Sequence, residues 1–536
     1  MVIDPQRRAR EASLPSDRFF DRLPLRLAAT GLSILVGQGS LAQTAANANA
    51  GAPRDPWRVQ SSLSLMETYS DNINLAPSGS ERSDLVTTIS PSLRVTRLSP
   101  RLTLNLGYSP QLLYYASGTN GTTIHNYLDA AANATLVQNL LYFDAQGNVS
   151  QQNVSPFGAL AANTVNGSSN RVETRSFSLG PSIRSRLGND LSYRAGYRYS
   201  TTSSDSNALS RNNTDQIYGV VETSTSFRDL GVSANFDRTD IRYGGQNEIL
   251  TENIGTTLTY VVSPTLRLRA GVGYDRNDYP SFPDRNLDGP SYFGGFDWTP
   301  SRNTGLNAQI GHRYFGNTAN ILFTQRTPRT VFNVSYTRDQ TTSSQSFGGL
   351  VANPNYALLD QLLQASIPDP VRRAQAVTAT LSQAGLPTSR FDQIGFVSNQ
   401  LYLQKRFDVS LALLGVRNTV TFDVYRSESQ ALSALSFSND VFNQSQSFRQ
   451  RGASATWTYR LGPRTTTTVT AQKLRNESLV GTANTRQRIV TASVNRQIGR
   501  RTSGSLQYRN SRQDGSGVGS GNYHENALIG SIRFDY

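Results

Sequence analysis

The sequence contains no cysteine, only two lysines and no long run of apolar residues. Without cysteine, the chain can form no disulfide, no thiolate metal site and no cysteine nucleophile. A helix needs about 20 consecutive apolar residues to cross a bilayer. Because the chain is only 37% hydrophobic and its mean hydropathy is −0.43, it is too polar to be a helical membrane protein.

Groups that carry catalysis are scarce as well. The three histidines, His125, His312 and His524, are isolated from one another in the sequence, whereas a Ser-His-Asp triad needs a histidine held by a carboxylate. No metal-ligand spacing and no glycine-rich phosphate loop is recognisable. We therefore predict that the chain is not an enzyme and has no cofactor and no metal ion.

Positive charge and aromatic residues are abundant. The formal net charge is +14, and nearly all of the positive charge comes from arginine. The arginines fall singly at alternate positions and not in tails or helices, which argues against a nucleic-acid partner. The 24 tyrosines and 22 phenylalanines of this otherwise polar chain are typical of a porin-like barrel, whose aromatic girdles mark the two membrane interfaces.

The N-terminus has the pattern of a targeting segment. Residues 1–26 carry six arginines, an apolar stretch follows at 27–37, and Ser40-Leu41-Ala42 has the small-x-small form of a cleavage site. These parts predict a secretory signal peptide at residues 1–42, with an amphipathic surface helix as the alternative. Residues 43–56 then read as a flexible leader, too short for a folded plug domain.

Apolar and polar residues alternate through the rest of the chain. The alternation is clear in residues 102–114, 191–200, 266–275 and 453–461, and about ten residues of period two make a strand that crosses a bilayer at a tilt. Backbone groups in lipid must all be paired, so the sheet has to close. We predict an all-β fold, a transmembrane antiparallel up-and-down β-barrel of about 22 strands (18–24) over residues 57–536.

The connections between these strands alternate in length. Short turns such as Leu187-Gly-Asn-Asp190 and Ser263-Pro-Thr265 have turn-forming chemistry, whereas segments such as 70–84, 152–172 and 429–446 are long and polar. Short turns on one side and long loops on the other are the asymmetry of a bacterial outer-membrane barrel. This predicts the outer membrane as the location and its lipid as a partner.

The last strand carries an expected assembly signal. Leu528, Ile532, Phe534 and Tyr536 share one face, and the chain ends on the aromatic residue. This pattern resembles the C-terminal signal read by the bacterial barrel-assembly machinery, which we therefore predict as a partner.

Residues 356–385 break the strand pattern. Leu358, Leu359, Leu362 and Leu363 follow a helical period, Pro368 and Pro370 interrupt it, and a second alanine-rich helix is expected up to about residue 384. By strand parity this is a helical insertion in a long loop. It is either a surface loop that packs its own apolar face or a loop that folds into the lumen and narrows the pore.

Arginines on the polar face of the strands are the candidate functional residues. Charge facing lipid is costly, so these side chains should line the lumen. Guanidinium groups bind carboxylate and phosphate, so such a lumen suits an anionic solute or an acidic polysaccharide. The alternative is that they pair with lumen acids such as Asp237, Asp275, Asp423 and Asp535. The candidates are Arg94, Arg184, Arg194, Arg198, Arg267, Arg269, Arg460 and Arg533.

Several segments resemble one known group of proteins. They are Glu67–Pro77 (ETYSDNINLAP), Asp84–Leu93, Asp369–Val377, Leu403–Arg406 and Ala412–Val420. In these segments the chain resembles outer-membrane β-barrel proteins associated with the PEP-CTERM/exosortase system. The resemblance implies a channel associated with exopolysaccharide biosynthesis and export, with exopolysaccharide and its export apparatus as partners, and it supplies no catalytic residues. A general diffusion porin, and a barrel-based enzyme or adhesin, are the alternatives.

Overall fold

The computed structural model describes residues 57–536 apart from several short gaps. The predicted signal peptide (1–42) and leader (43–56) lie outside the described residues. The gaps fall at 189, 206–208, 224–228, 245–247, 282–285, 346–353, 364–372, 374–375, 378–395, 436, 438–439 and 518–520.

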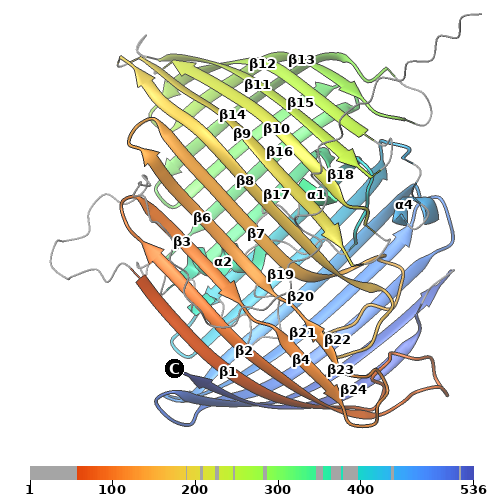
Figure 1. The fold of residues 1–536 in the computed structure, drawn as a ribbon. Helices are drawn as coiled ribbons and strands as arrows, with labels where there is room; N and C mark the ends of the chain where they lie inside the picture. The colour runs from red at the N-terminus through yellow and green to blue at the C-terminus, as the bar shows by residue number, and fades with distance from the viewer. Residues whose placement is uncertain are drawn as a thin grey trace, which may run out of the picture. The chain divides into compact units, whose positions relative to one another are not determined.

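The described chain forms one antiparallel sheet that closes on itself (Figure 1). Each strand pairs with its neighbours in sequence, and the first strand, β1, pairs with both β2 and the last strand, β24. Two positions of the barrel are each occupied by two segments, β3 with β4 and β5 with β6. The closed barrel therefore has 22 strands, which confirms the predicted fold class and strand number.

Strands alternate in direction between an end with mostly short turns, the turn end, and an end with mostly long loops, the loop end. Strands running toward the loop end are β1 (Trp57–Ser70), β3 (Leu102–Tyr108) with β4 (Gln111–Tyr115), β7 (Leu141–Asn153), β9 (Leu191–Ser204), β11 (Leu230–Tyr243), β13 (Leu266–Asp278), β15 (Thr304–Arg313), β17 (Thr330–Thr341), β19 (Asn418–Ala431), β21 (Thr465–Ser478) and β23 (Thr502–Ser516). Returning strands are β2 (Asp84–Leu98), β5 (Thr123–His125) with β6 (Leu128–Val137), β8 (Arg171–Leu187), β10 (Asn212–Thr223), β12 (Glu248–Ser263), β14 (Gly289–Ser301), β16 (Gly316–Arg326), β18 (Tyr402–Leu414), β20 (Ser447–Gly462), β22 (Asn484–Gln497) and β24 (Tyr523–Asp535).

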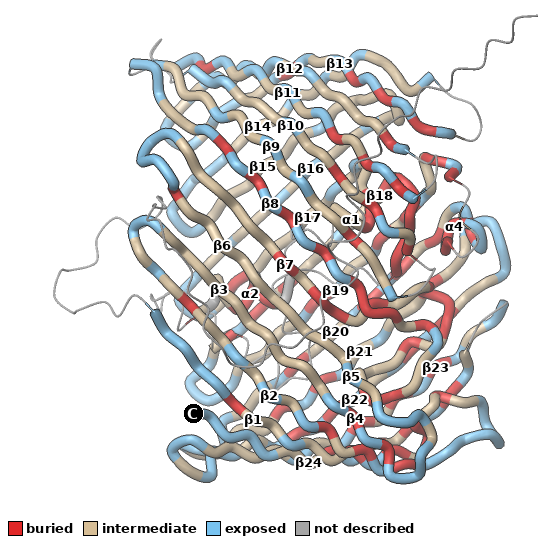
Figure 2. The backbone as a smooth tube through the Cα atoms, in the orientation of Figure 1, coloured by how far each residue is buried: buried red, intermediate tan, exposed pale blue. Residues whose placement is uncertain are grey.

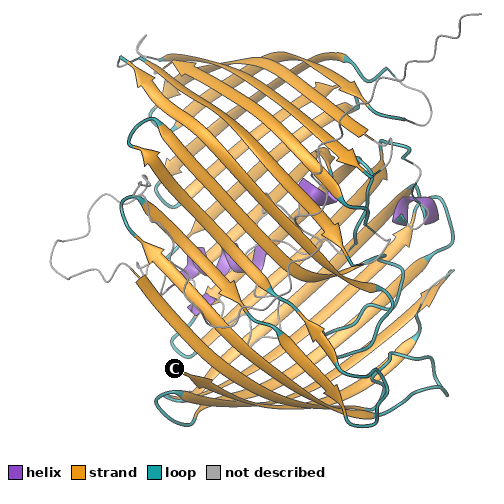
Figure 3. Cartoon of the chain, in the orientation of Figure 1, coloured by secondary structure: helices purple, strands orange, loops and turns teal. Residues whose placement is uncertain are grey.

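In the described part of the chain, three short helices belong to segments that join strands at the loop end (Figure 3). They are α1 (Ser343–Gln345) and α2 (Pro354–Leu363), both between β17 and β18, and α4 (Val441–Gln444) between β19 and β20. None of the helices in the described residues is long and apolar enough to cross a membrane.

Side chains alternate between the inside and the outside of the barrel. Large apolar residues point outward and are exposed, for example Val272 at 68% and Ile254 at 60%. The residues next to them in the sequence point inward, and many of these are polar, as Asn253 is beside Ile254 on β12. Such an apolar outer surface would be unfavourable in water and is stable only against lipid.

The C-terminal strand completes the ring. Leu528, Ile532 and Phe534 point outward and are 51%, 43% and 40% exposed. The backbone N–H of Tyr536 donates to the carbonyl of Ser61 at 2.9 Å and extends the pairing to the end of the chain. The residues of the predicted assembly signal thus lie on the outer face of the strand that closes the barrel.

Two details differ from the sequence-based expectation. The strand predicted at 102–114 is interrupted at Ser109 and Pro110, because proline has no N–H to donate to the neighbouring strand. In addition, β15 and β16 are joined at the loop end by only Tyr314 and Phe315, where the alternation of short and long connections predicted a long loop.

Candidate functional site: the lumen and its loop seal

A loop from one wall of the barrel crosses the lumen at the loop end. This crossing loop, residues 154–170, joins β7 to β8, yet its backbone is held by inward side chains of β21–β24. Asn476 donates to the carbonyl of Pro156 at 2.6 Å and Thr485 to that of Phe157 at 3.1 Å. Gln513 donates to the carbonyl of Gly158 at 2.9 Å. These bonds satisfy backbone groups that would otherwise be buried without partners.

The crossing loop is anchored by a buried ion pair. Arg509 and Glu525 are 2.9 Å apart, and their side chains are only 3% and 0% exposed. Asn166 of the crossing loop donates to Glu525 at 2.6 Å, and Ser70 donates to the same carboxylate oxygen at 2.8 Å. A buried charge is tolerated only when it is paired and hydrogen-bonded, so this pair fixes the crossing loop to the wall of β23 and β24.

A second segment, residues 396–401 ahead of β18, meets the crossing loop from the opposite side. With β3/β4 and β5/β6 each counted as one position, β7 is fifth and β18 is sixteenth, half-way around a ring of 22. Nevertheless the N–H of Val397 donates to the carbonyl of Val154 at 3.4 Å. Asn399 also accepts a 2.9 Å bond from the N–H of Ser210, in the loop between β9 and β10.

Asp440, at the start of α4, holds segment 396–401 in place. Its carboxylate accepts from the hydroxyl of Ser398 at 2.9 Å, from the N–H of Asn399 at 2.6 Å and from the N–H of Phe442 at 3.0 Å. Burial raises the pKa of Asp440 above its ordinary value, although these three hydrogen bonds favour the ionised form. Asp440 therefore joins the segment that precedes β18 to the loop that follows β19.

Apolar packing completes this closure. Phe157, Phe396, Tyr402, Phe442 and Phe448 form one buried cluster with Val441, and the rings of Phe396 and Phe448 are 4.9 Å apart in an edge-to-face arrangement. Figure 2 shows the buried residues gathered at this end of the barrel. We call residues 154–170, 396–401 and the described part of 432–446 the loop seal, because together they span the loop end of the lumen.

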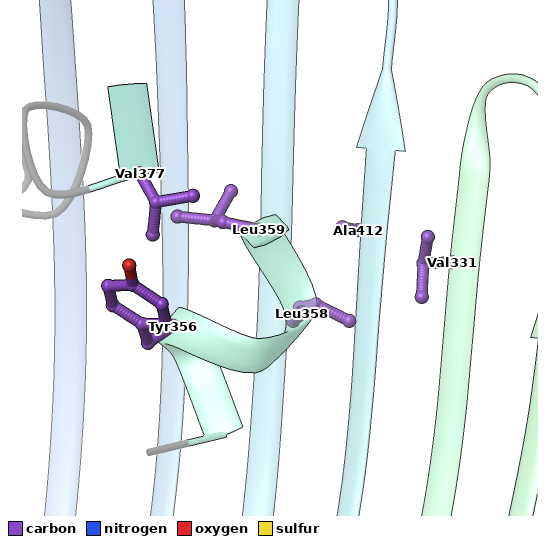
Figure 4. Packing of buried hydrophobic residues seen from close by; sticks show 6 residues of the cluster. All are labelled: Val331, Tyr356, Leu358, Leu359, Val377 and Ala412. Carbon is purple, nitrogen blue, oxygen red and sulfur yellow. The ribbon is translucent and has the colours of Figure 1, made fainter. Parts of the chain in front are cut away.

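Helix α2 lies inside the lumen and far from the seal. Leu358 and Leu359 pack against Val331 and Ala412 (Figure 4). Val331 and Ala412 lie near the turn ends of β17 and β18 and face inward. The next inward residues on the same two strands are polar. The structure therefore favours the lumen interpretation of the insertion over that of a surface loop.

The second helix predicted in this insertion lies mostly outside the described residues. Three of its residues are described, Arg373, Ala376 and Val377. Arg373 pairs with Asp360 of α2 at 2.8 Å, and Val377 is fully buried in the cluster around Leu358. Both contacts tie the insertion together on the inner wall.

The structure places all eight arginines proposed as lumen residues on the inward face. All except Arg198 lie within five residues of the turn end of their strand. The set therefore forms a basic ring around the turn-end mouth. Its members are Arg94 on β2, Arg184 on β8, Arg194 and Arg198 on β9, Arg267 and Arg269 on β13, Arg460 on β20 and Arg533 on β24.

Some of these arginines are neutralised by acids and others are not. Arg269 pairs with Asp297 at 2.5 Å, Arg533 with Asp535 at 2.8 Å, and Arg184 lies 3.6 Å from Asp144. By contrast, Arg194, Arg267 and Arg460 make no ion pair within the described residues. Of the acids proposed as partners, Asp535 pairs with a proposed arginine, whereas Asp275 pairs with Arg313 and Asp237 accepts from Gln216.

The sequence analysis did not identify the arginines that lie nearer the loop end and join neighbouring strands of the lumen wall. Arg313 binds Asp275 at 2.8 Å and Asp339 at 3.2 Å. Asn253 donates to the same Asp275 at 2.8 Å, so the network spans β12 to β17. A cavity of about 460 Å³ lies against this wall, and Gln309 and Arg313 are among its mostly inward-facing lining residues. Arg313 and its partners occupy inward positions of the alternating strand pattern, and this pattern could have identified them from the sequence.

Aromatic rings accompany several inward arginines. The guanidinium of Arg184 lies 5.0 Å from the ring of Tyr142, that of Arg198 6.0 Å from Tyr218 and that of Arg406 5.0 Å from Tyr425. Arginine stacked on an aromatic ring can keep hydrogen-bond donors free beside a flat apolar surface, but the donors of Arg406 already bind Asp408 at 2.9 Å. This combination can bind a sugar ring that carries a carboxylate.

The location of the protein follows from its closed sheet, its apolar outer surface and the difference between its turn end and its loop end. The protein is an outer-membrane β-barrel. Its loop end faces the outside of the cell and its turn end faces the periplasm. The three histidines stay apart, on β5, β15 and β24, and no group of three potential metal ligands occurs among the described residues.

Comparisons with known proteins give only distant structural matches. No family model and no curated protein sequence matches the chain. Among solved structures, the siderophore receptor PirA from Pseudomonas aeruginosa aligns over 91% of this chain and 81% of its own, with 8% identity and a TM-score of 0.37. The FrpB iron transporter from Neisseria meningitidis aligns over 89% and 82%, with 10% identity and a TM-score of 0.46. A loop-deletion mutant of OmpT, an outer-membrane protein of Vibrio cholerae, aligns over 90% and 100%, with 9% identity and a TM-score of 0.33.

Proposed function

We propose that this barrel is a gated channel that exports an anionic polysaccharide from the periplasm. The observation that carries the proposal is the difference between its two mouths. The periplasmic mouth carries a ring of inward arginines, among which Arg194, Arg267 and Arg460 make no ion pair within the described residues. The outer mouth is closed by the loop seal. A basic entry and a closed exit suit an acidic polymer that arrives from inside the cell.

The width of the barrel supports a closed transporter over a general diffusion porin. Barrels of about 16–18 strands leave an open aqueous channel, whereas barrels of about 22 strands enclose a filled lumen. Here the filling comes from the loop seal and from α2, both of which belong to the barrel's own loops.

The polysaccharide part of the proposal rests on the lumen wall and on the sequence resemblance. The pairs Arg184–Tyr142 and Arg198–Tyr218 offer a flat apolar surface beside cationic donors at two places in the lumen, whereas Arg406 beside Tyr425 is already bound to Asp408 at 2.9 Å. A neutral sugar would use only the rings, and a small inorganic anion only the charges. The combination therefore favours an acidic sugar polymer. We propose no catalytic step for this lumen.

Asymmetric block of the channel tests this function. A variant that lacks residues 155–169 of the crossing loop would be inserted into planar bilayers, with oligogalacturonate added to one side at a time. We expect block of the current from the turn-end side at a concentration about tenfold lower than from the loop-end side, because the basic ring faces that side. Equal block from both sides, or block by neutral dextran at the same concentration, would contradict the proposal.

Uptake of a ferric siderophore is the second candidate, favoured by the filled 22-strand barrel itself. The two candidates differ in cells. Loss of the gene should lower secreted acidic polysaccharide and leave growth on iron-limited medium unchanged if the channel exports polymer. The reverse pair of results would support siderophore uptake.

A further inference from the structure

Four arginines stand side by side on the outer wall of the barrel near the loop end. The strand register places Arg426 opposite Arg451, Arg451 opposite Arg475, and Arg475 opposite Arg486, across β19 to β22. They share the outward face with exposed apolar residues such as Val490. Directly opposed side chains lie about 5 Å apart, and like charges in such pairs are destabilising. The row therefore needs negative charge from outside the sheet or from nearby acids.

A second row lies one outward position closer to the turn end. Lys473 is opposite Arg488, and Arg488 is opposite Arg512. Together with flanking residues, these rows form one positively charged surface, which we call the basic outer patch. Its cations are Lys405, Arg426, Arg449, Arg451, Lys473, Arg475, Arg486, Arg488 and Arg512.

The acids within the patch do not neutralise it. Glu428 is shared among Lys405, Arg426 and Arg449 at 2.7–3.8 Å. Glu477 is likewise shared, at 3.0–3.1 Å, by Arg449, Arg451 and Arg475. Asp514 pairs with Arg512 at 3.1 Å. Nine cations thus face three carboxylates, which leaves a surplus of six positive charges.

Three of the cations have no carboxylate at all. Lys473, Arg486 and Arg488 are exposed, and none of them forms an ion pair within the described part of the chain. They lie at the centre of the patch, on the adjacent strands β21 and β22. Their donors are free to bind an anion that approaches from the outside.

The opposite sector of the outer wall has the reverse balance. On β10 to β13, near the same end of the barrel, the outward face carries three arginines, Arg238, Arg242 and Arg276, against five acids. Arg238 pairs with Glu252 at 2.8 Å, and Arg242 contacts Asp215. The acids are Asp215, Asp240, Glu248, Glu252 and Asp278. The surplus of positive charge is therefore a property of one sector and not of the whole rim.

The position of the patch indicates its partner. On β22 the outward residues beyond Arg488 toward the turn end are Val490, Ala492 and Val494, so the patch borders the apolar band on its external side. Lipid headgroups lie at this level, and arginine binds phosphate through forked hydrogen bonds. We propose that the basic outer patch binds the phosphate groups of a phosphorylated glycolipid in the external leaflet of the membrane.

Retention of lipopolysaccharide by the purified barrel tests this proposal. The patch variant Lys473→Gln, Arg486→Gln, Arg488→Gln is compared with the matched control Arg238→Gln, Arg242→Gln, Arg276→Gln on the opposite sector. Native mass spectrometry counts the lipid bound to each full-length barrel in detergent. We expect the wild type and the control to keep lipopolysaccharide, and the patch variant to retain about fivefold less.

Two further measurements keep the test decisive. Heat-modifiable migration on gels shows that each variant is folded, and the wild-type barrel is also offered lipopolysaccharide stripped of its phosphates. If phosphate is recognised, the stripped lipid binds about fivefold more weakly to the wild type. This comparison uses only the wild-type barrel, so it does not depend on whether the patch variant folds. Equal binding of the stripped lipid, or equal retention by the folded patch variant, would overturn the proposal.

Discussion

The two ends of the barrel are built from contacts of very different range. At the turn end, neighbouring strands are joined within a few residues, as where Leu187 pairs with Leu191. At the loop end, Gln513 holds the carbonyl of Gly158, 355 positions away in the chain. The structure of the turn end, with its basic ring, is therefore determined by local sequence. The contacts at the loop end form only once the whole barrel has closed. Changes at the loop end should alter passage through the lumen, and changes at the turn end should alter which ions pass.

The largest expected effect comes from removing the crossing loop. Replacing residues 155–169 with a short Gly-Ser linker takes away the backbone groups that Asn476, Thr485 and Gln513 hold. Single-channel conductance should rise about tenfold or more, because a barrel of about 22 strands is wide when it is not filled. The control replaces residues 479–482, which lie in a loop outside the seal, and should leave conductance unchanged. A closed channel after removal of the crossing loop would show that the seal is not the barrier.

The next effect is on stability, at the ion pair under the seal. Arg509→Met leaves the buried carboxylate of Glu525 without its partner, and such a change costs about 3–5 kcal/mol. Urea unfolding in detergent measures this loss. The control Arg512→Met removes an ion pair whose side chains are 62% and 63% exposed, which should cost less than about 1 kcal/mol. Equal losses would mean that the pair does not anchor the crossing loop.

A smaller change is expected at the clamp between the loops. Asp440→Ala removes the acceptor for Ser398, Asn399 and Phe442, and unsatisfied buried donors cost about 1–3 kcal/mol. The seal should open intermittently, so recordings should show brief openings and not a permanent pore. Asp440→Asn keeps part of the hydrogen bonding and should open less often than the alanine variant. No increase in openings for either variant would contradict the clamp.

The smallest effect is predicted at the turn end. Reversing charge in the triple variant Arg194→Glu, Arg267→Glu, Arg460→Glu should change the ratio of anion to cation permeability several-fold, while conductance changes by less than about twofold. The measurement is the reversal potential in a salt gradient, made in the background that lacks the crossing loop. An unchanged reversal potential would show that the basic ring does not govern entry.

The sequence predicted the turn end and the wall far better than the loop end. Alternation and turn residues such as Gly188 and Pro264 are local signals, and they were sufficient for the strand number and for the inward face of Arg194 or Arg460. The break at Pro110 followed from the missing N–H of proline but was hidden by the alternation around it. The local sequence pattern is therefore sufficient to predict the barrel.

The seal could not be predicted because its partners are remote in the sequence. Nothing around Asn166 indicates that it will meet Glu525, and nothing around Asp440 indicates that it will hold Ser398. Their positions depend on closure of a ring of 22 strands, which brings opposite walls together. Similarly, Leu358 predicted a helix, but its inward contact forms only once β17 and β18 pair and place Val331 opposite Ala412.

Disulfide trapping tests the central claim most directly, since the chain has no cysteine of its own. Val154 and Val397 come from opposite walls, and their backbones are joined by a 3.4 Å hydrogen bond. In the double variant Val154→Cys, Val397→Cys, mild oxidation of intact outer membranes should form an internal disulfide, visible as a shift on non-reducing gels. The pair Val154→Cys, Val416→Cys, with its second cysteine at the turn end, should form none. Failure of the first pair to cross-link in the folded barrel would contradict a lumen sealed by its own loops.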